Sequence, residues 1–171
     1  MTGPKRIVCL TEETVEMLYL LGAADRIVGV TGYAVRPPEV RREKPRVGAF
    51  TSADVPKILG LRPDLVLTFS DLQADIAADL IRAGVAVHAF NQRDVAGILD
   101  MIRTLGALVG KGNEAAALIE GIEGGIAEVR RVAALAATNQ RYILGAHEPK
   151  GVLQWKTTNA HLLTLWSTWA S

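Results

Sequence analysis

The chain has 171 residues, a formal net charge of +1, 49% hydrophobic residues and 22% charged residues. This composition excludes an intrinsically disordered chain, and the length allows one domain with a substantial hydrophobic core. Because the net charge is close to zero, no long-range field attracts nucleic acid or an anionic membrane, and we expect neither as a partner. The only cysteine is Cys9, which excludes an internal disulfide bond.

Short apolar runs alternate with helical patterns along most of the chain. Buried strands are predicted at residues 7–10, 27–30, 65–69 and 85–90, with a minor strand that opens at Val47. Helices are predicted after Thr11, which suits an N-cap, and over 55–61, 72–84, 95–108 and 114–136. This alternation predicts an α/β fold with right-handed crossovers, a mostly parallel sheet and flanking helices.

The predicted organisation has three parts. Residues 1–112 form an N-terminal α/β ligand-binding lobe, residues 113–138 form a long helix, and residues 139–171 form an atypical tail. All three tryptophans lie in this tail, and residues 142–144 are read there as one more possible strand. The tail is therefore interpreted as a truncated or altered start of a second lobe.

Neither a secretory signal nor a membrane span is visible in the sequence. The basic pair Lys5-Arg6 is followed by an apolar run of only residues 7–10, far shorter than a signal peptide requires. A membrane span requires roughly 20 apolar residues. We therefore expect a cytoplasmic chain as written, and a periplasmic or cell-surface chain if a leader was removed.

Parallel α/β sheets bind ligands beyond the carboxyl ends of their strands. That rule selects five loops, at residues 11–12, 31–38, 50–52, 69–71 and 91–93. Tyr33, Phe50 and Phe69 each lie at the end of a predicted strand or just beyond it. One interpretation is an aromatic platform for a large, partly apolar ligand, and the alternative is that these rings pack beneath the loops.

Other candidate chemistries have simpler explanations. The glycine-rich run at 106–111 is one residue short of a phosphate-binding loop and is explained by the end of a helix. The three histidines, His88, His147 and His161, have no partners at metal-ligand spacing, so no metal site is expected. Cys9 precedes a helix N-terminus that would lower the pKa of its thiol. No histidine is placed to activate this thiol, so we expect no enzymatic activity.

Two charged groups border the selected loops. Glu12, Glu13 and Glu16 do not form an obvious acid–base pair; Glu12 and Glu16 lie four residues apart on one helix face, and capping and solvation account for all three. A basic group follows the second loop, at Arg36, Arg41, Arg42, Lys44 and Arg46. Its members are either solvated loop residues or partners for an anionic group of a ligand.

Several segments match one family in order and spacing. They are residues 6–8, 20–23, 26–31, 37–38, 45–48 and 61–66, together with Tyr33. The last segment includes Pro63, which ends the preceding helix before an apolar strand. On these segments, residues 5–136 resemble the first lobe and connecting helix of the metal-chelate substrate-binding proteins of ABC importers. The nearest likeness is to the cobalamin-binding branch of that family.

The resemblance implies two α/β lobes joined by a long helix, with a ligand gripped between them. It implies cobalamin or a related corrinoid as ligand, with no cofactor and no catalysis. Phe50 and Phe69 match loops that contact cobalamin in the family, and Tyr33 matches a family tyrosine. The predicted ligand-binding residues are Glu12, Tyr33, Arg36, Phe50, Thr51, Phe69, Ser70, Asp71 and Gln92.

The resemblance also implies an ABC permease as partner. Cobalamin binders commonly have an acidic residue for permease docking where Pro56 stands here, and Asp54 lies nearby out of register. The alternative function is an interaction domain that has lost transport and binds no small molecule. In that case a homodimer, another partner or the tryptophan-rich tail would cover the exposed apolar face.

Overall fold

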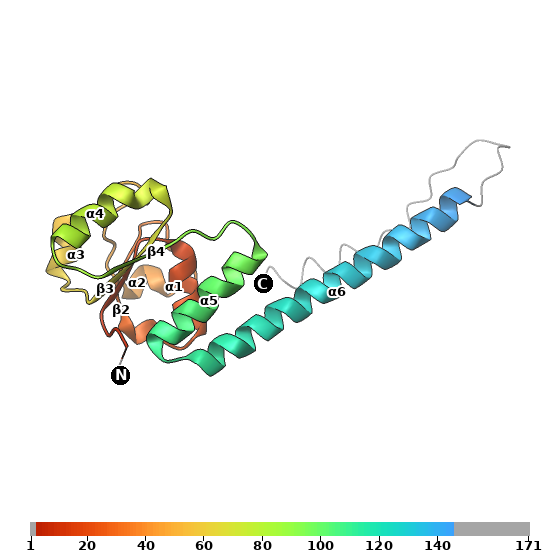
Figure 1. Cartoon of the computed structure of the whole chain (residues 1–171), viewed down its shortest axis with the longest axis horizontal. Coiled ribbons are helices and arrows are strands. Elements are labelled where there is room, and N and C mark those ends of the chain that lie inside the picture. Colours follow the sequence, from red (N-terminus) through yellow and green to blue (C-terminus); the bar gives the residue numbers. More distant parts are fainter. Residues whose placement is uncertain (1–2, 146–171) are drawn as a thin grey trace. The chain divides into compact units, whose positions relative to one another are not determined.

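The computed structural model describes residues 3–145. By its internal contacts the chain divides into two units, residues 1–128 and 129–171. The first unit contains one four-stranded sheet in the order β2-β1-β3-β4, and every neighbouring pair of strands is parallel (Figure 1). The strands are β1 (Ile7–Cys9), β2 (Ile27–Val30), β3 (Leu65–Phe69) and β4 (Val87–Phe90). The predicted α/β fold with a parallel sheet is therefore confirmed.

Helices cover both faces of the sheet. They are α1 (Glu12–Leu20), α2 (Val40–Glu43), α3 (Val55–Gly60), α4 (Ala74–Arg82), α5 (Val95–Val109) and α6 (Gly112–Gly145), with short 3₁₀ turns η1 (Ala24–Arg26) and η2 (Asp71–Gln73). Figure 1 shows α3 and α4 on one side of the strands and α1 and α5 on the other. Connections of this kind between parallel strands bring the four carboxyl ends to one edge.

The core has two parts because successive strand residues point to opposite faces. Ile7 and Cys9 of β1 pack with residues of α1, α5 and the start of α6. Val8, between them, packs instead with Ile58 of α3 and Leu80 of α4. Both faces of the strand are therefore buried, which explains why it reads as a continuous apolar run.

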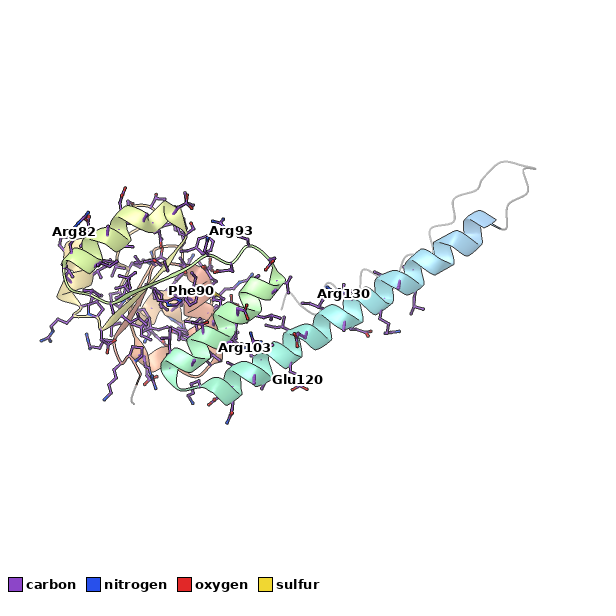
Figure 2. All side chains as sticks on the ribbon, in the orientation of Figure 1. Arg82, Phe90, Arg93, Arg103, Glu120 and Arg130 are labelled. Carbon is purple, nitrogen blue, oxygen red and sulfur yellow. The ribbon has the colours of Figure 1, made fainter. Side chains whose placement is uncertain are left out.

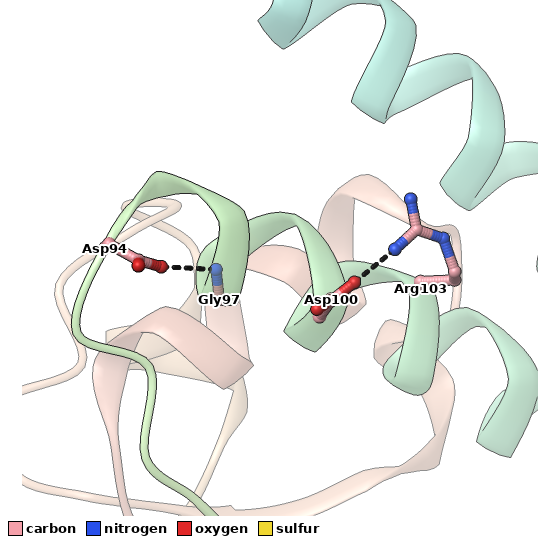
Figure 3. A network of polar contacts seen from close by, with 4 residues as sticks. All are labelled: Asp94, Gly97, Asp100 and Arg103. Carbon is pink, nitrogen blue, oxygen red and sulfur yellow. Dashed lines mark hydrogen bonds and ion pairs between the residues drawn. The ribbon is translucent and has the colours of Figure 1, made fainter.

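Local sequence signals set the ends of α5 (Figure 3). The Asp94 carboxylate accepts a hydrogen bond from the Gly97 backbone N–H at 2.7 Å, which caps the first turn. Gly110 ends the helix in the left-handed region at φ 68°, where a side chain would add strain. Between these ends, Asp100 and Arg103 form an exposed ion pair one turn apart. Such pairs add little stability, so the cap is the stronger local determinant.

Several predicted elements differ from the structure. Val47 is buried, but it lies between isolated bridges of its neighbours, Arg46 with Val30 and Gly48 with Ala53, and belongs to no named strand. The strand expected at 85–90 is shorter, because β4 begins at Val87. The helix expected at 72–84 begins only at Ala74, because the 3₁₀ turn η2 precedes it.

Helix α6 is longer than the sequence pattern predicts. It ends at Gly145, beyond both the expected helix end at Ala136 and the expected part boundary at residue 138. Residues 142–144 are therefore helical, and the interpretation of them as a strand is wrong. The reason is local, since no glycine or proline interrupts residues 126–144. The remainder of the predicted tail, residues 146–171 with its tryptophans, lies outside the described residues.

No helix within residues 3–145 combines the length and the hydrophobicity that crossing a bilayer requires.

Candidate ligand site at the carboxyl edge of the sheet

A pocket of about 410 Å³ lies beside the carboxyl edge of the sheet, within the first unit. Its walls come from α1, the loop at Phe50, the end of β3, the loop after β4, α5 and the first part of α6. The lining residues are Glu13, Met17, Phe50, Phe69, Gln92, Ile98, Met101, Ile102 and Ile122. Seven of these nine residues are apolar, and only Glu13 and Gln92 are polar. Mostly apolar walls with few polar groups are typical of a small-molecule site.

Two phenylalanines form an aromatic wall of this pocket. The ring centroids of Phe50 and Phe69 are 6.4 Å apart, and their planes are tilted by 49°. Arg93 belongs to the loop between β4 and α5 (Figure 2). Its guanidinium lies 5.4 Å from the centroid of the Phe69 ring. Both separations fall in the range of favourable aromatic and cation–π contacts. The predicted convergence of Phe50 and Phe69 is thus present in the structure.

Tyr33 does not join the other two rings. Its side chain is 62% exposed, it is absent from the pocket lining, and no ring contact joins it to Phe50 or Phe69 within the described part of the chain. The expectation that three rings gather along the edge is therefore wrong for Tyr33. Its loop follows β2, an outer strand of the sheet, whereas Phe69 ends the central strand β3.

Gln73 holds the aromatic wall in place. Its side chain is only 1% exposed and reaches three backbone segments. The amide oxygen accepts a hydrogen bond from the Phe69 N–H at 2.9 Å. The amide nitrogen donates to the Phe50 carbonyl at 2.7 Å and to the Leu10 carbonyl at 3.2 Å. One buried amide therefore ties the loops after β1 and before α3 to the end of β3.

Glu13 and Gln92 supply the two polar groups of the pocket. The Gln92 amide nitrogen donates to a carboxylate oxygen of Glu13 at 3.3 Å. The Gln92 amide oxygen is buried and has no hydrogen-bond partner among the described residues. An unsatisfied buried acceptor costs about 1 to 3 kcal/mol, so a ligand donor at this position would be favoured.

Sequence reasoning found Gln92 but selected Glu12 rather than Glu13. The Glu12 carboxylate accepts a hydrogen bond from the Val35 backbone N–H at 3.3 Å and anchors the loop after β2. Glu12 is absent from the pocket lining, whereas Glu13 belongs to it. Successive helical residues point about 100° apart, and only the packing of α1 decides which of them faces the pocket.

The remaining predicted residues lie at or outside the rim. Arg36 and Thr51 are exposed and do not line the pocket. Ser70 turns the chain at φ 54°, and its hydroxyl accepts a hydrogen bond from the Leu72 N–H at 3.3 Å. Asp71 is exposed and lies 3.8 Å from Arg93 across the rim. Ser70 and Asp71 therefore shape and charge the rim without lining the pocket.

Apolar residues of α1, α5 and α6 were missed as pocket residues. These residues are Met17, Ile98, Met101, Ile102 and Ile122. They carry the ordinary 3.6-residue pattern of a buried helix face, which does not distinguish a pocket wall from a filled core.

The rejected chemistries find no support in the geometry. Burial raises the pKa of the Cys9 thiol to about 12, although the Thr14 hydroxyl opposes this. A thiol with so high a pKa is a poor nucleophile, in agreement with the small buried residue expected there. Desolvation lowers the pKa of His88, which lies 4.4 Å from the Phe90 ring. Within residues 3–145, no cluster of histidine, cysteine or carboxylate side chains is suited to a metal.

Two other sequence interpretations can be placed in the structure. The glycine-rich run at 106–111 ends α5, with the Lys111 N–H donating to the Gly106 carbonyl at 2.7 Å, as expected of a helix end. Asp54, weighed as a docking acid, caps α3 by accepting a hydrogen bond from the Lys57 N–H at 3.0 Å. Pro56 lies in the first turn of the same helix, where proline is well tolerated.

Residues 7–159 match a family described as periplasmic binding protein, which is most of the chain. The chain belongs to this family. An ABC transporter substrate-binding lipoprotein of Bacillus subtilis, otherwise uncharacterised, is 30% identical over 134 residues, 76% of this chain and 42% of the relative. A cobalamin-binding protein of Halobacterium salinarum is 31% identical over 136 residues, 78% of this chain and 35% of the relative.

Solved structures of periplasmic binding proteins share the fold. A periplasmic haem-binding protein from Pseudomonas aeruginosa has a TM-score of 0.71 and 24% identity, covering 81% of this chain and 49% of that chain. A periplasmic vitamin B12-binding protein from Vibrio cholerae has a TM-score of 0.70 and 23% identity, covering 78% of this chain and 51% of that chain. The chain thus spans less than half of the curated relatives and about half of the solved structures.

The resemblance to chelate-binding proteins of ABC importers is confirmed by these matches. Proteins with cobalamin, vitamin B12, haem and siderophore in their names all appear among the relatives and neighbours. Their names describe binding rather than catalysis, in agreement with the expected absence of enzyme activity. Several of these proteins are called periplasmic and one is called a lipoprotein.

Proposed function

We propose that this chain binds a metal chelate, of the cobalamin or corrinoid type, as the first lobe of a substrate-binding protein that feeds an ABC importer. The observation that carries this proposal is the pocket at the carboxyl edge, walled by the rings of Phe50 and Phe69. Relatives named for cobalamin and vitamin B12 support the ligand class. The proposed organisation is an N-terminal lobe over residues 1–112, a long helix that follows it and continues to Gly145 rather than ending at the expected residue 138, and a distinct tail after that helix.

The pocket suits one side of a large ring system. A corrinoid with its peripheral side chains is larger than a pocket of about 410 Å³, so the site holds an edge of the ligand rather than the whole molecule. Phe50 and Phe69 offer apolar surface to that edge, and burial of each ring contributes about 1.5 to 3 kcal/mol. The opposite side of the ligand receives no contact from this lobe, which limits the affinity that these contacts alone supply.

Calorimetry tests the proposal directly. We expect saturable binding of dicyanocobinamide to the full chain, and we expect Phe50→Ala and Phe69→Ala each to weaken it about tenfold or more. Tyr33→Ala is the matched control, because Tyr33 is an exposed ring of a neighbouring loop outside the pocket. Ferric haem and a ferric siderophore, titrated in parallel, distinguish the chelate classes. No heat with any of them at millimolar ligand would contradict the proposal.

The proposal places the natural protein outside the cytoplasm with an ABC permease as its partner. The names of the relatives support both points. Asp54 is already engaged as a helix cap, so docking through that carboxylate would uncap α3. Cell fractionation of the natural host with an antibody against the chain tests the location, and recovery only in the cytosolic fraction would contradict it.

A further inference from the structure

The otherwise apolar walls of the pocket contain one polar pair, Glu13 and Gln92. Glu13 contributes a carboxylate, which only accepts hydrogen bonds when it is ionised. The Gln92 amide nitrogen donates one of its two N–H groups to Glu13, and its amide oxygen is left without a partner among the described residues. The pocket therefore presents the Glu13 carboxylate as an acceptor, and the buried Gln92 oxygen beside it lacks a donor.

Resting on the proposed function, we propose that this polar pair makes the pocket selective for a chelate that presents uncharged N–H donors, such as peripheral carboxamides, over one that presents carboxylates. A ligand amide N–H would bind the Glu13 carboxylate, and a turn of the Gln92 side chain would bring its unpaired oxygen to a second N–H. A ligand carboxylate has no donor to offer there, and it is repelled by Glu13 across apolar surroundings, where charges are screened weakly.

The nearest rim cation does not cancel this preference. The Arg93 guanidinium lies over the Phe69 ring and 3.8 Å from the Asp71 carboxylate, whose opposite charge offsets its own. Both of those side chains are mostly exposed, so water screens them as well. The pocket thus carries an acceptor pair inside its walls and a compensated ion pair on its rim.

Helix capping alone does not explain the pair. Glu13 lies in the first turn of α1, where the helix dipole stabilises an acidic side chain. That effect requires no partner from another element, and Glu12 in the same turn already provides it. Gln92 reaches Glu13 from the loop after β4, 79 positions along the chain, and buries an acceptor in doing so. A binding role accounts for both features.

The test uses two corrins that differ only in their peripheral groups. Dicyanocobinamide carries carboxamides, and dicyanocobyrinic acid carries carboxylates on the same macrocycle. Calorimetry on the full chain is expected to give at least tenfold tighter binding of the carboxamide form. Glu13→Gln removes the charge and is expected to reduce this ratio about tenfold. Gln92→Leu removes the orphaned acceptor and is expected to weaken the carboxamide form alone.

Glu16→Gln is the matched control, since it makes the same charge change on the same helix outside the pocket lining. Circular dichroism verifies that each variant is folded. Equal binding of both corrins, or equal ratio changes for Glu13→Gln and Glu16→Gln, would overturn the selectivity and leave the proposed function standing. Binding of neither corrin to the wild-type chain would overturn the proposed function and the selectivity together.

Discussion

At the residue scale, Gln73 is the side chain on which the aromatic wall depends. Replacement by leucine keeps a similar volume but leaves the Phe69 N–H and the carbonyls of Phe50 and Leu10 without their partner. Since a buried unsatisfied group costs about 1 to 3 kcal/mol, Gln73→Leu is expected to lower the free energy of unfolding by about 2 kcal/mol or more. Urea denaturation followed by circular dichroism measures this loss.

Asn91→Leu is the control for Gln73→Leu, because it also removes an amide near the carboxyl edge but from an exposed position. A change of less than about 0.5 kcal/mol is expected for it. If both variants lost the same stability, the three hydrogen bonds of Gln73 would not be the cause.

Also at the residue scale, the buried Cys9 thiol is expected to lower the free energy of unfolding at high pH. Its pKa is raised from 9.0 to about 12 in the fold by burial, so the folded chain keeps the proton while the unfolded chain loses it above pH 9. The free energy of unfolding is therefore expected to decrease by up to about 1.4 kcal/mol per pH unit above pH 9 from this group.

Comparison with Cys9→Ala isolates that effect. The pKa of Tyr19 is also raised, first by desolvation and then by its hydrogen bond to Glu43, but this contribution is common to both proteins and cancels. Urea denaturation at pH 8, 9 and 10 gives the two slopes. Identical slopes would show that the thiol is not held neutral by the fold.

At the element scale, α5 and α6 pack closely where they are joined. Gly106 lies at this junction, and Gly121 of α6 provides a comparison in open surroundings. A Cβ at Gly106 would lie 2.5 Å from the Ala115 Cβ and 3.0 Å from the Lys111 carbonyl oxygen, whereas a Cβ at Gly121 would meet nothing within 4 Å. Gly106→Ala is therefore expected to destabilise the chain by about 1 to 3 kcal/mol through overpacking. Gly121→Ala is expected to stabilise it by about 0.5 to 1 kcal/mol through helix propensity.

Thermal unfolding monitored by circular dichroism compares the two substitutions, which add the same methyl group. Opposite signs are expected. A stabilising Gly106→Ala would show that the two helices are less closely packed at their junction than the structure describes.

At the scale of the whole molecule, the proposed ligand should stabilise the fold as a unit. A ligand at 100 times its dissociation constant adds about 2.7 kcal/mol when it binds only the folded chain. Dicyanocobinamide is therefore expected to raise the melting temperature by about 5 to 10 °C. Phe50→Ala with Phe69→Ala should abolish the shift at the same ligand concentration, and a shift that survives this double substitution would place the ligand elsewhere.

Sequence alone determined the alternation of strands and helices, the parallel sheet and three of the selected loops, at residues 50–52, 69–71 and 91–93, that contribute residues to the pocket. These follow from local properties, namely apolar periodicity, caps such as Asp94 and helix ends such as Gly110. The sequence indicated Phe50, Phe69 and Gln92, which line the pocket, because each lies in a loop or at a strand end that the topology brings to the carboxyl edge of the sheet.

Only the tertiary structure decided which side chains of those loops and helices meet. Gln73 bonds to a carbonyl 63 positions away, and Gln92 meets Glu13 across 79 positions, so no local pattern marks either pair. The choice of Glu13 over Glu12, and of Phe50 and Phe69 over Tyr33, depends on how α1 and the outer strand β2 pack. Packing depends on contacts between segments that are far apart in sequence, so the periodicity within one segment cannot predict it.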